Sequence, residues 1–107
     1  MKKLLTGNEA IAEGAIESGV EVVTGYPGTP STEVVLTLLP QEKELGIHIE
    51  WSINEKVAFE IASAAAWAGK RALVTMKMSG VNVAADSLAS VAYSGCTGGL
   101  VVFVADD

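Results

Sequence analysis

Residues 54–80, NEKVAFEIASAAAWAGKRALVTMKMSG, decide the fold of this chain. The alanine-rich segment 54–69 predicts a helix that ends at Gly69, because alanine has the highest helix propensity and glycine commonly follows a last helical turn. The run RALVTM predicts a strand over 71–76, and Gly80 precedes another alanine-rich segment. A helix, a strand and a second helix in this order are typical of a parallel sheet covered by helices.

The same alternation of helix and strand extends along the rest of the chain. Short runs rich in β-branched residues predict four strands, at 20–25, 47–52, 71–76 and 100–105. Stretches with helical spacing predict four helices, over 6–19, 30–46, 54–69 and 81–95. Helices and strands that alternate in this way predict an α/β protein, with three α/β/α layers and a mainly parallel sheet.

Local signals mark several helix ends. Thr6 and Glu9 have the spacing of a capping box, and Gly19 stands where the first helix is expected to stop. Pro30 is predicted to occupy the first turn of the second helix, the position that proline prefers. Pro40 is predicted to end or kink that helix, because proline lacks a backbone N–H and clashes with the preceding turn.

The strand pattern at 100–105 lies close to the end of the sequence. In a parallel α/β protein, a helix and further strands usually follow such a strand. We therefore expect residues 1–107 to be one partial domain, a truncated fragment whose C-terminal strands are missing.

Charge and cysteine content exclude several classes of function. The 107 residues include 7 basic and 13 acidic ones, for a formal net charge of -6, which argues against binding nucleic acid or an anionic membrane. The single cysteine, Cys96, excludes a disulfide within the chain and a metal cluster held by several thiolates. No apolar run reaches the ~20 residues that span a bilayer. These features predict a soluble cytoplasmic protein.

Ligands of open parallel α/β sheets bind outside the carboxyl ends of the strands. Three loops of this chain are predicted to lie there, TGYPGTPST at 24–32, WSINEK at 51–56 and MKMSGVN at 76–82. Each combines polar side chains with glycine, proline or the start of a helix. We expect the functional residues among them.

Glu55, at the start of the third helix, has two interpretations. Ser52 and Glu55 have the Ser-x-x-Glu spacing of a capping box, and a carboxylate in a first turn is favoured by the helix dipole. Alternatively, Glu55 is a carboxyl group at the ligand edge, where apolar neighbours allow it to exchange a proton with a ligand nitrogen. The residues alone favour the cap and leave the second interpretation open.

Other polar residues point less clearly to a site. Lys77 precedes a helix start that can bind an anion, but a helix cap with a solvated lysine is the favoured interpretation. His48, the only histidine, alternates with apolar residues and is predicted to be structural. Cys96 lies in a glycine-rich loop with no neighbouring base to activate it. Asp106 and Asp107 are too few to hold a metal ion, so no metal site is predicted.

Three stretches together resemble a known family: GYPGTPSTEV at 25–34, NEKVAFEIASAAAWAGKRALVTMKMSGVNVAADSL at 54–88, and GGLVVFVADD at 98–107. They resemble the pyrimidine-binding domain of the thiamin diphosphate-dependent 2-oxoacid:ferredoxin oxidoreductases, most closely the alpha subunit of the indolepyruvate branch. The resemblance implies a thiamin diphosphate-binding (pyrimidine) type of fold. It also implies oxidative decarboxylation of arylpyruvates to arylacetyl-CoA, with electrons passed through iron–sulfur clusters to ferredoxin.

The resemblance also assigns roles to residues. Glu55 matches the family glutamate that hydrogen-bonds the pyrimidine nitrogen opposite the amino group and takes part in its proton exchange. The family motif Tyr-Pro-x-Thr-Pro-Ser matches residues 26–31 and covers the reacting end of the cofactor. Thr29 is then a candidate for binding the substrate carboxylate, and we hypothesise that Gly28 makes room for an aryl side chain. The implied cofactor-binding residues are Tyr26, Pro27, Gly28, Thr29 and Glu55.

The resemblance implies that much of the machinery lies outside this chain. No Gly-Asp-Gly motif for the diphosphate and its metal is present, and one cysteine cannot hold a cluster. Thiamin diphosphate would be shared with a diphosphate-binding domain of the same or a neighbouring chain. Mg²⁺, the [4Fe-4S] clusters, a second (beta) subunit, CoA and ferredoxin would belong to the full enzyme, and the isolated chain is expected to be inactive.

Three alternatives remain open. The chain can be a non-catalytic assembly or binding domain of the same fold, or part of an enzyme for another 2-oxoacid such as pyruvate or 2-oxoglutarate. A nucleotide-binding module of flavodoxin or Rossmann type is the least favoured, because no Gly-x-Gly-x-x-Gly fingerprint follows the first strand.

Overall fold

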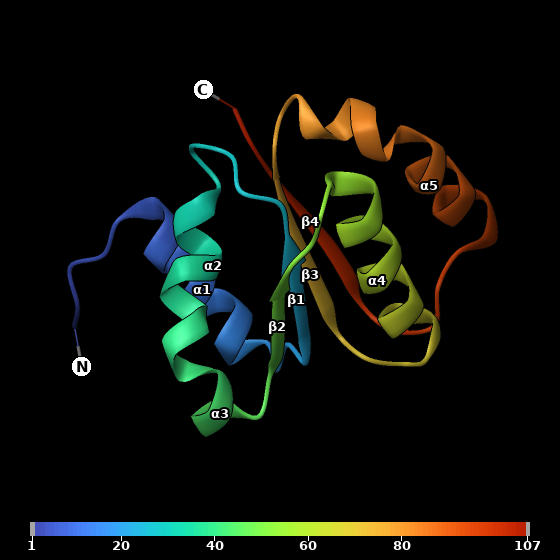
Figure 1. Ribbon diagram of the computed structural model, residues 1–107. Helices are drawn as coiled ribbons and strands as arrows, with labels where there is room; N and C mark the ends of the chain where they lie inside the picture. The colour runs from blue at the N-terminus through green and yellow to red at the C-terminus, as the bar shows by residue number, and fades with distance from the viewer. Residues whose placement is uncertain (1, 107) are drawn as a thin grey trace.

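The computed structural model describes residues 2–106 and contains one four-stranded sheet. All strand pairs are parallel, and the strand order is β2-β1-β3-β4. The strands are β1 (Val22–Gly25), β2 (His48–Trp51), β3 (Ala72–Lys77) and β4 (Leu100–Ala105) (Figure 1). The predicted parallel sheet is confirmed.

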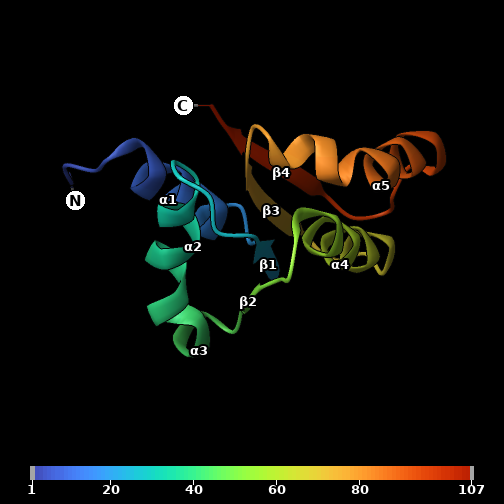
Figure 2. The ribbon, with the colours of Figure 1, turned by 45° about the horizontal axis from the view of Figure 1, so that its top comes forward.

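Helices cover both faces of the sheet, as Figure 2 shows. They are α1 (Gly7–Glu17), α2 (Thr32–Leu38), the 3₁₀ turn η1 (Leu39–Gln41), α3 (Glu42–Leu45), α4 (Glu55–Trp67) and α5 (Gly80–Ser94). On one face α1 and α2 pack over Val23 and Leu73. On the other face Phe59 of α4 and Ala84 of α5 pack against Val74 of the sheet. The predicted three-layer α/β/α arrangement is therefore confirmed.

The helix predicted over 30–46 is divided by proline. The helix α2 ends at Leu38, Pro40 lies in η1, and α3 follows, so the predicted interruption is confirmed. The prediction that Pro30 occupies the first helical turn is wrong, because α2 begins at Thr32 with Ser31 as its N-cap residue. Residues 28–31 form a separate turn, closed by the Ser31 N–H, which donates to the Gly28 carbonyl at 2.8 Å.

Both ends of α1 and the C-terminal end of α4 follow the predicted chemistry. The Thr6 Oγ1 accepts from the Glu9 N–H, and the Thr6 N–H donates to the Glu9 carboxylate at 2.9 Å, which completes the capping box. That backbone hydrogen bond lowers the pKa of Glu9. Gly19 and Gly69 follow the helix ends with φ of 76° and 89°, the left-handed region that glycine adopts without steric cost.

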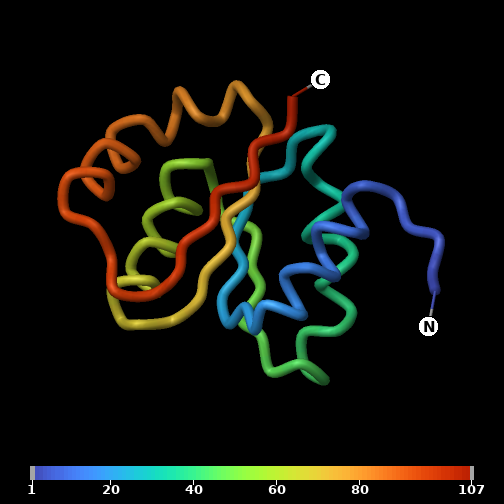
Figure 3. The backbone as a smooth tube through the Cα atoms, turned by 180° about the vertical axis from the view of Figure 1, so that it is seen from behind, coloured from blue at the N-terminus to red at the C-terminus, as the bar shows by residue number. Residues whose placement is uncertain are grey.

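The strand order creates a switch point between β1 and β3. From β1 the chain passes through α2 to β2, and from β3 it passes through α5 to β4 on the other side. Because α2 and α5 lie on opposite faces, the loops after β1 and β3 diverge, and ligands of such sheets bind in the crevice between them. Figure 3 shows both loops at the same edge as the end of β4.

Candidate functional site

The carboxyl edge of the sheet gathers the three predicted loops. The strands end there at Gly25, Trp51, Lys77 and Ala105. The loop of residues 26–31 follows β1, the start of α4 follows β2, and the start of α5 follows β3 (Figure 1). The candidate site is therefore made of three segments that are far apart in the sequence.

Hydrogen bonds hold the loop of residues 26–31 in one shape. The Gly28 N–H donates to the Thr32 Oγ1 at 2.9 Å, and the Gly28 carbonyl accepts from the Ser31 hydroxyl at 2.8 Å. The Asn8 amide of α1 donates to the Pro30 carbonyl at 2.6 Å, and the Thr29–Pro30 peptide bond is cis. The loop is thus attached both to its own helix and to α1.

In this anchored loop, some side chains of the predicted motif are buried and others are exposed. Ser31 is fully buried, and its hydroxyl serves the turn. Tyr26, Pro27 and Thr29 are exposed at the edge of the sheet, and Gly28 is half-buried. The exposed side chains are free to meet a ligand, while the backbone that carries them is held.

Glu55 is the first residue of α4, but Ser52 does not cap this helix. The N-cap residue is Asn54, whose side-chain oxygen accepts from the Val57 N–H at 2.9 Å. Ser52 instead continues the sheet edge, since its N–H donates to the Gly25 carbonyl at 2.8 Å. Its hydroxyl is buried without a hydrogen-bond partner among residues 2–106. The predicted Ser52 capping box is therefore wrong.

Because Asn54 and not Ser52 caps α4, substitutions at these two positions should change the free energy of unfolding by different amounts. Asn54→Ala should lower the free energy of unfolding by about 1 kcal/mol, because it leaves the Val57 N–H without its cap. Ser52→Ala should change it by less than about 0.5 kcal/mol, since the Ser52 hydroxyl has no partner to lose. Chemical denaturation of the two variants measures both values. A larger loss for Ser52→Ala would contradict this assignment of the cap.

The Glu55 side chain lies against the first turn of α5. An ideal Cβ built on Gly80 would lie 2.5 Å from the Glu55 Cγ and 2.8 Å from its Oε2. Gly80 is buried and Glu55 is half-buried. Within residues 2–106 the Glu55 carboxylate accepts no hydrogen bond and forms no ion pair. It therefore lies at the starts of two helices with its acceptor oxygens available.

Two buried residues at this edge, Thr75 and Gly80, were not predicted as site residues from the sequence. Thr75 of β3 is fully buried, and its hydroxyl has no partner among residues 2–106. It occupies the space above Gly25, where an ideal Cβ would lie 2.5 Å from the Thr75 Oγ1. Gly80 carried one usable signal, because glycine is a poor helix former and stands at the start of α5. No local signal in the sequence indicates Thr75.

Lys77 differs from its predicted surroundings. It is half-buried at the end of β3, not fully solvated. Ser79 is the N-cap residue of α5 but its side chain makes no capping hydrogen bond. An ideal Cβ on Gly28 would lie 3.1 Å from the Lys77 Cβ. The prediction of a solvated lysine beside a helix cap is therefore wrong. Lys77 packs against the loop of residues 26–31.

The remaining polar candidates lie apart from this edge or complete no site. His48 begins β2 at the opposite end of the sheet and lies 3.2 Å from the Glu50 carboxylate. Cys96 is exposed in the loop before β4. Asp106 follows β4 as an exposed residue, and Asp107 lies outside the described residues. In the part of the chain that is described, no three His, Cys, Asp or Glu side chains gather as metal ligands.

Two surface hollows also lie away from Glu55. One of about 380 Å³ lies between α1 and the amino ends of β3 and β4, and another of about 240 Å³ lies between α4 and α5. Neither is lined by Glu55 or by residues 26–31. Among the helices that the structure describes, none is long and apolar enough to cross a bilayer.

Comparison with known proteins identifies related sequences. The chain is 53% identical over 106 residues to the indolepyruvate oxidoreductase subunit IorA of Pyrococcus horikoshii, covering 99% of this chain and 16% of that subunit. It is 54% identical to IorA of Archaeoglobus fulgidus, covering 99% of the chain and 18% of the subunit. Identity to the 2-oxoglutarate synthase subunit KorA of Methanothermobacter thermautotrophicus is 38% over 72 residues, 64% of the chain. No family model matches.

A solved structure shares the fold. The 2-oxoglutarate:ferredoxin oxidoreductase of Magnetococcus marinus superposes with a TM-score of 0.89 and 24% identity, over 95% of this chain and 18% of that one. The chain thus spans about one sixth of the length of the relatives that it matches.

Proposed function

Because the chain is homologous over nearly its whole length to about one sixth of the archaeal IorA subunits, we propose that it is the pyrimidine-binding part of an indolepyruvate:ferredoxin oxidoreductase. Such an enzyme would oxidatively decarboxylate arylpyruvates to arylacetyl-CoA and pass the electrons to ferredoxin. The proposal covers residues 1–107 as part of one domain of a larger subunit. Its relatives are named as oxidoreductases.

The observation that carries the proposal is the position of the Glu55 carboxylate. It lies at the carboxyl edge of the sheet, half-buried, at the first turn of α4 and against that of α5. Its oxygens have no hydrogen-bond donor within residues 2–106. A half-buried carboxylate in this position suits a heterocycle that offers a ring nitrogen and its proton.

The residues at this edge fit the aminopyrimidine part of thiamin diphosphate. Besides the Glu55 carboxylate, the edge contains the unpartnered buried hydroxyls of Ser52 and Thr75, and Gly80 lies against the Glu55 side chain. When bound, thiamin diphosphate supplies the electron sink that a 2-oxoacid needs to lose carbon dioxide. The protein residues bind and orient that group.

Each residue of the predicted site has a proposed role. Glu55 holds and exchanges the proton at the pyrimidine nitrogen. Tyr26, Pro27 and Gly28 line the reacting end on an anchored backbone, which keeps the site in one geometry. Thr29, with its exposed hydroxyl, donates to the substrate carboxylate. Gly28 is proposed to influence which 2-oxoacid side chain is accepted.

We assign the remaining parts to other components of the enzyme. The diphosphate and Mg²⁺ belong to a partner domain of the same or a neighbouring chain. The [4Fe-4S] clusters, the second subunit and the binding sites for CoA and ferredoxin also lie outside residues 1–107. Indolepyruvate is favoured over 2-oxoglutarate as substrate, since identity to IorA exceeds identity to KorA and extends over more of the chain.

A half-site of this kind predicts weak cofactor binding by the isolated chain. Calorimetry should detect no saturable binding of thiamin diphosphate up to about 1 mM, because the diphosphate and metal contacts are missing. Thiamin without its diphosphate should behave in the same way, since the chain meets only the ring. Micromolar affinity for thiamin diphosphate, lost with thiamin, would mean that these 107 residues bind the diphosphate themselves, and would contradict the proposed division of the site.

A further inference from the structure

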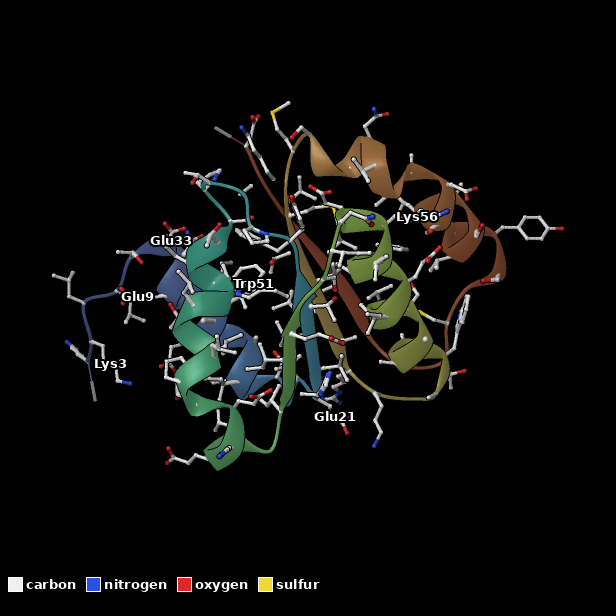
Figure 4. All side chains as sticks on the ribbon, in the orientation of Figure 1. Lys3, Glu9, Glu21, Glu33, Trp51 and Lys56 are labelled. Atoms are coloured by element: carbon white, nitrogen blue, oxygen red, sulfur yellow. The ribbon has the colours of Figure 1, made fainter. Side chains whose placement is uncertain are left out.

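Asn8 joins the first helix to the loop of residues 26–31. It is the second residue of α1, which begins at Gly7, and its side-chain amide donates to the Pro30 carbonyl at 2.6 Å. The same nitrogen donates to the Glu33 carboxylate at 3.3 Å, in the first turn of α2. In Figure 4, Glu33 lies at the start of α2, beside the start of α1. One amide group thus links α1 to residues 22 and 25 positions further along the chain.

The two partners determine which end of the Asn8 amide faces the loop. A backbone carbonyl and an ionised carboxylate accept hydrogen bonds and donate none. The amide nitrogen has two N–H groups, one for each acceptor, whereas the amide oxygen has no hydrogen to donate. The nitrogen must therefore lie between Pro30 and Glu33, and an oxygen in its place would be repelled by both.

The needs of α1 itself do not explain an asparagine at this position. Thr6 caps the helix, and Glu9 completes the capping box. An acidic residue in a first helical turn is favoured by the helix dipole, so aspartate would suit α1 at least as well as asparagine. Asn8 accordingly serves contacts outside its own helix, and those contacts are with Pro30 and Glu33.

The Pro30 carbonyl belongs to the turn that presents Thr29. Ser31, on the other side of this carbonyl, binds the Gly28 carbonyl through its N–H and its hydroxyl, both at 2.8 Å. The turn is therefore closed from within by Gly28 and Ser31, and Asn8 holds it from another helix. Because one planar peptide unit separates Pro30 from Thr29, the contact with Asn8 limits how far the exposed Thr29 side chain can shift.

We propose that Asn8 is a positioning residue for substrate binding, which acts on the substrate through Thr29. This inference rests on the proposed function, in which the Thr29 hydroxyl donates to the carboxylate of the 2-oxoacid. Asn8 does not touch the substrate. Its amide fixes the Pro30 carbonyl and thereby the position of that hydroxyl. A misplacement of about 1 Å can reduce a rate by about 10²-fold, so a contact made from a neighbouring helix can influence turnover.

Asn8→Asp tests this role with almost no change of side-chain shape. The new carboxylate oxygen would face the Pro30 carbonyl and the Glu33 carboxylate as a third acceptor, so the turn must move away. We expect kcat/KM of the assembled oxidoreductase for an arylpyruvate to fall by about 10- to 100-fold. Glu33→Gln should leave kcat/KM within about twofold of wild type, since the glutamine oxygen still accepts from Asn8 and the contact with Pro30 remains.

Gln41→Glu is the matched control at the opposite end of α2. Gln41 is half-buried, as Asn8 is, and its amide donates to the Thr37 carbonyl at 3.2 Å. The substitution makes the same exchange of an amide for a carboxylate against a backbone carbonyl, but away from the loop that carries Thr29. Its kcat/KM should remain within about twofold of wild type.

A double-mutant cycle distinguishes positioning from a merely structural role. Thr29→Val keeps the branched shape of the side chain and removes the hydroxyl. In this background, Asn8→Asp should reduce kcat/KM by less than about threefold further, because residues that act through one another are not additive. Full additivity of the two losses would overturn the inference.

Hydrogen exchange gives a readout that does not depend on turnover. The Ser31 N–H donates to the Gly28 carbonyl, so this amide exchanges slowly while the turn is held. In the assembled enzyme, Asn8→Asp should raise the exchange rate within residues 26–33 by about tenfold or more, and Gln41→Glu should leave it unchanged. Unchanged exchange in Asn8→Asp would show that Asn8 does not hold the turn, and the inference would fail.

The outcomes separate this inference from the proposed function. If wild-type enzyme turns over arylpyruvates and Asn8→Asp retains the normal kcat/KM, the assignment of Asn8 fails and the proposed function stands. If the wild-type assembly neither binds thiamin diphosphate nor turns over a 2-oxoacid, the proposed function fails, and the inference fails with it. Should Asn8→Asp not assemble, Asn8→Ala replaces it. Failure of both to assemble, with Gln41→Glu intact, assigns Asn8 a structural role and overturns the inference.

Discussion

Replacing Glu55 by glutamine in the assembled oxidoreductase is expected to reduce turnover of arylpyruvates by about 10²- to 10⁴-fold, the range for loss of a general acid–base group. Glutamine has almost the same shape and can still accept a hydrogen bond, but it cannot exchange a proton with the pyrimidine ring. Steady-state reduction of ferredoxin measures the loss. Subunit assembly, followed by size-exclusion chromatography, should be unchanged, since Glu55 has no partner within residues 2–106.

Glu60→Gln is the matched control on the same helix. Glu60 is exposed on α4, accepts from the Ser87 hydroxyl at 2.7 Å and pairs with Lys56 at 3.8 Å. Removing its charge should leave turnover within about twofold of wild type, because exposed ion pairs contribute little and Glu60 does not reach the carboxyl edge. Wild-type turnover in Glu55→Gln would instead support a non-catalytic assembly domain.

Replacing Gly80 by alanine is expected to reduce turnover by about 100-fold while the fold remains intact. The new methyl group would lie 2.5 Å from the Glu55 Cγ, so the Glu55 side chain must move away. A displacement of about 1 Å at a reacting group can cost about 10²-fold in rate. The fold should tolerate the change, since a side chain can rotate and alanine is a better helix former than glycine at the start of α5.

Two further variants test whether Gly80→Ala lowers turnover by displacing Glu55. Gly14→Ala in α1 is the control for helix propensity, because an ideal Cβ there meets nothing within 4 Å, and its turnover should be unchanged. Gly80→Ala in a Glu55→Gln background should cause little further loss, since residues that act through one another are not additive. Full additivity of the two losses would show that Gly80 acts independently of Glu55.

The arrangement of helices and strands was predictable because its signals are local. Alanine content, runs of β-branched residues and single glycines act within one turn or strand, and the observed elements follow them closely. The capping box of Thr6 and Glu9 formed as predicted, since both partners lie in one helical turn. The interruption at Pro40 depends only on the missing N–H of that residue.

Predictions failed where neighbours in space compete with neighbours in sequence. Ser52 has the spacing of a cap, but its N–H is taken by the Gly25 carbonyl of the adjacent strand. Asn54 then becomes the residue with the extended backbone that a cap requires. Lys77 looks solvated in the sequence, but in the structure it is half-buried, and Gly28 of another loop lies against its stem.

The amino-acid sequence by itself determined the alternation of helices and strands, the layers that follow from it, and which loops lie at the carboxyl edge of the sheet. These depend on propensities and on the general geometry of parallel sheets. Only the tertiary structure decided how the side chains at that edge meet. Gly80 receives Glu55, and Gly28 receives the stem of Lys77, in contacts between segments 25 and 49 positions apart. Such contacts depend on strand order and helix placement. Folding brings together residues that are distant in the sequence, and the local sequence around one of them does not predict its contact with the other.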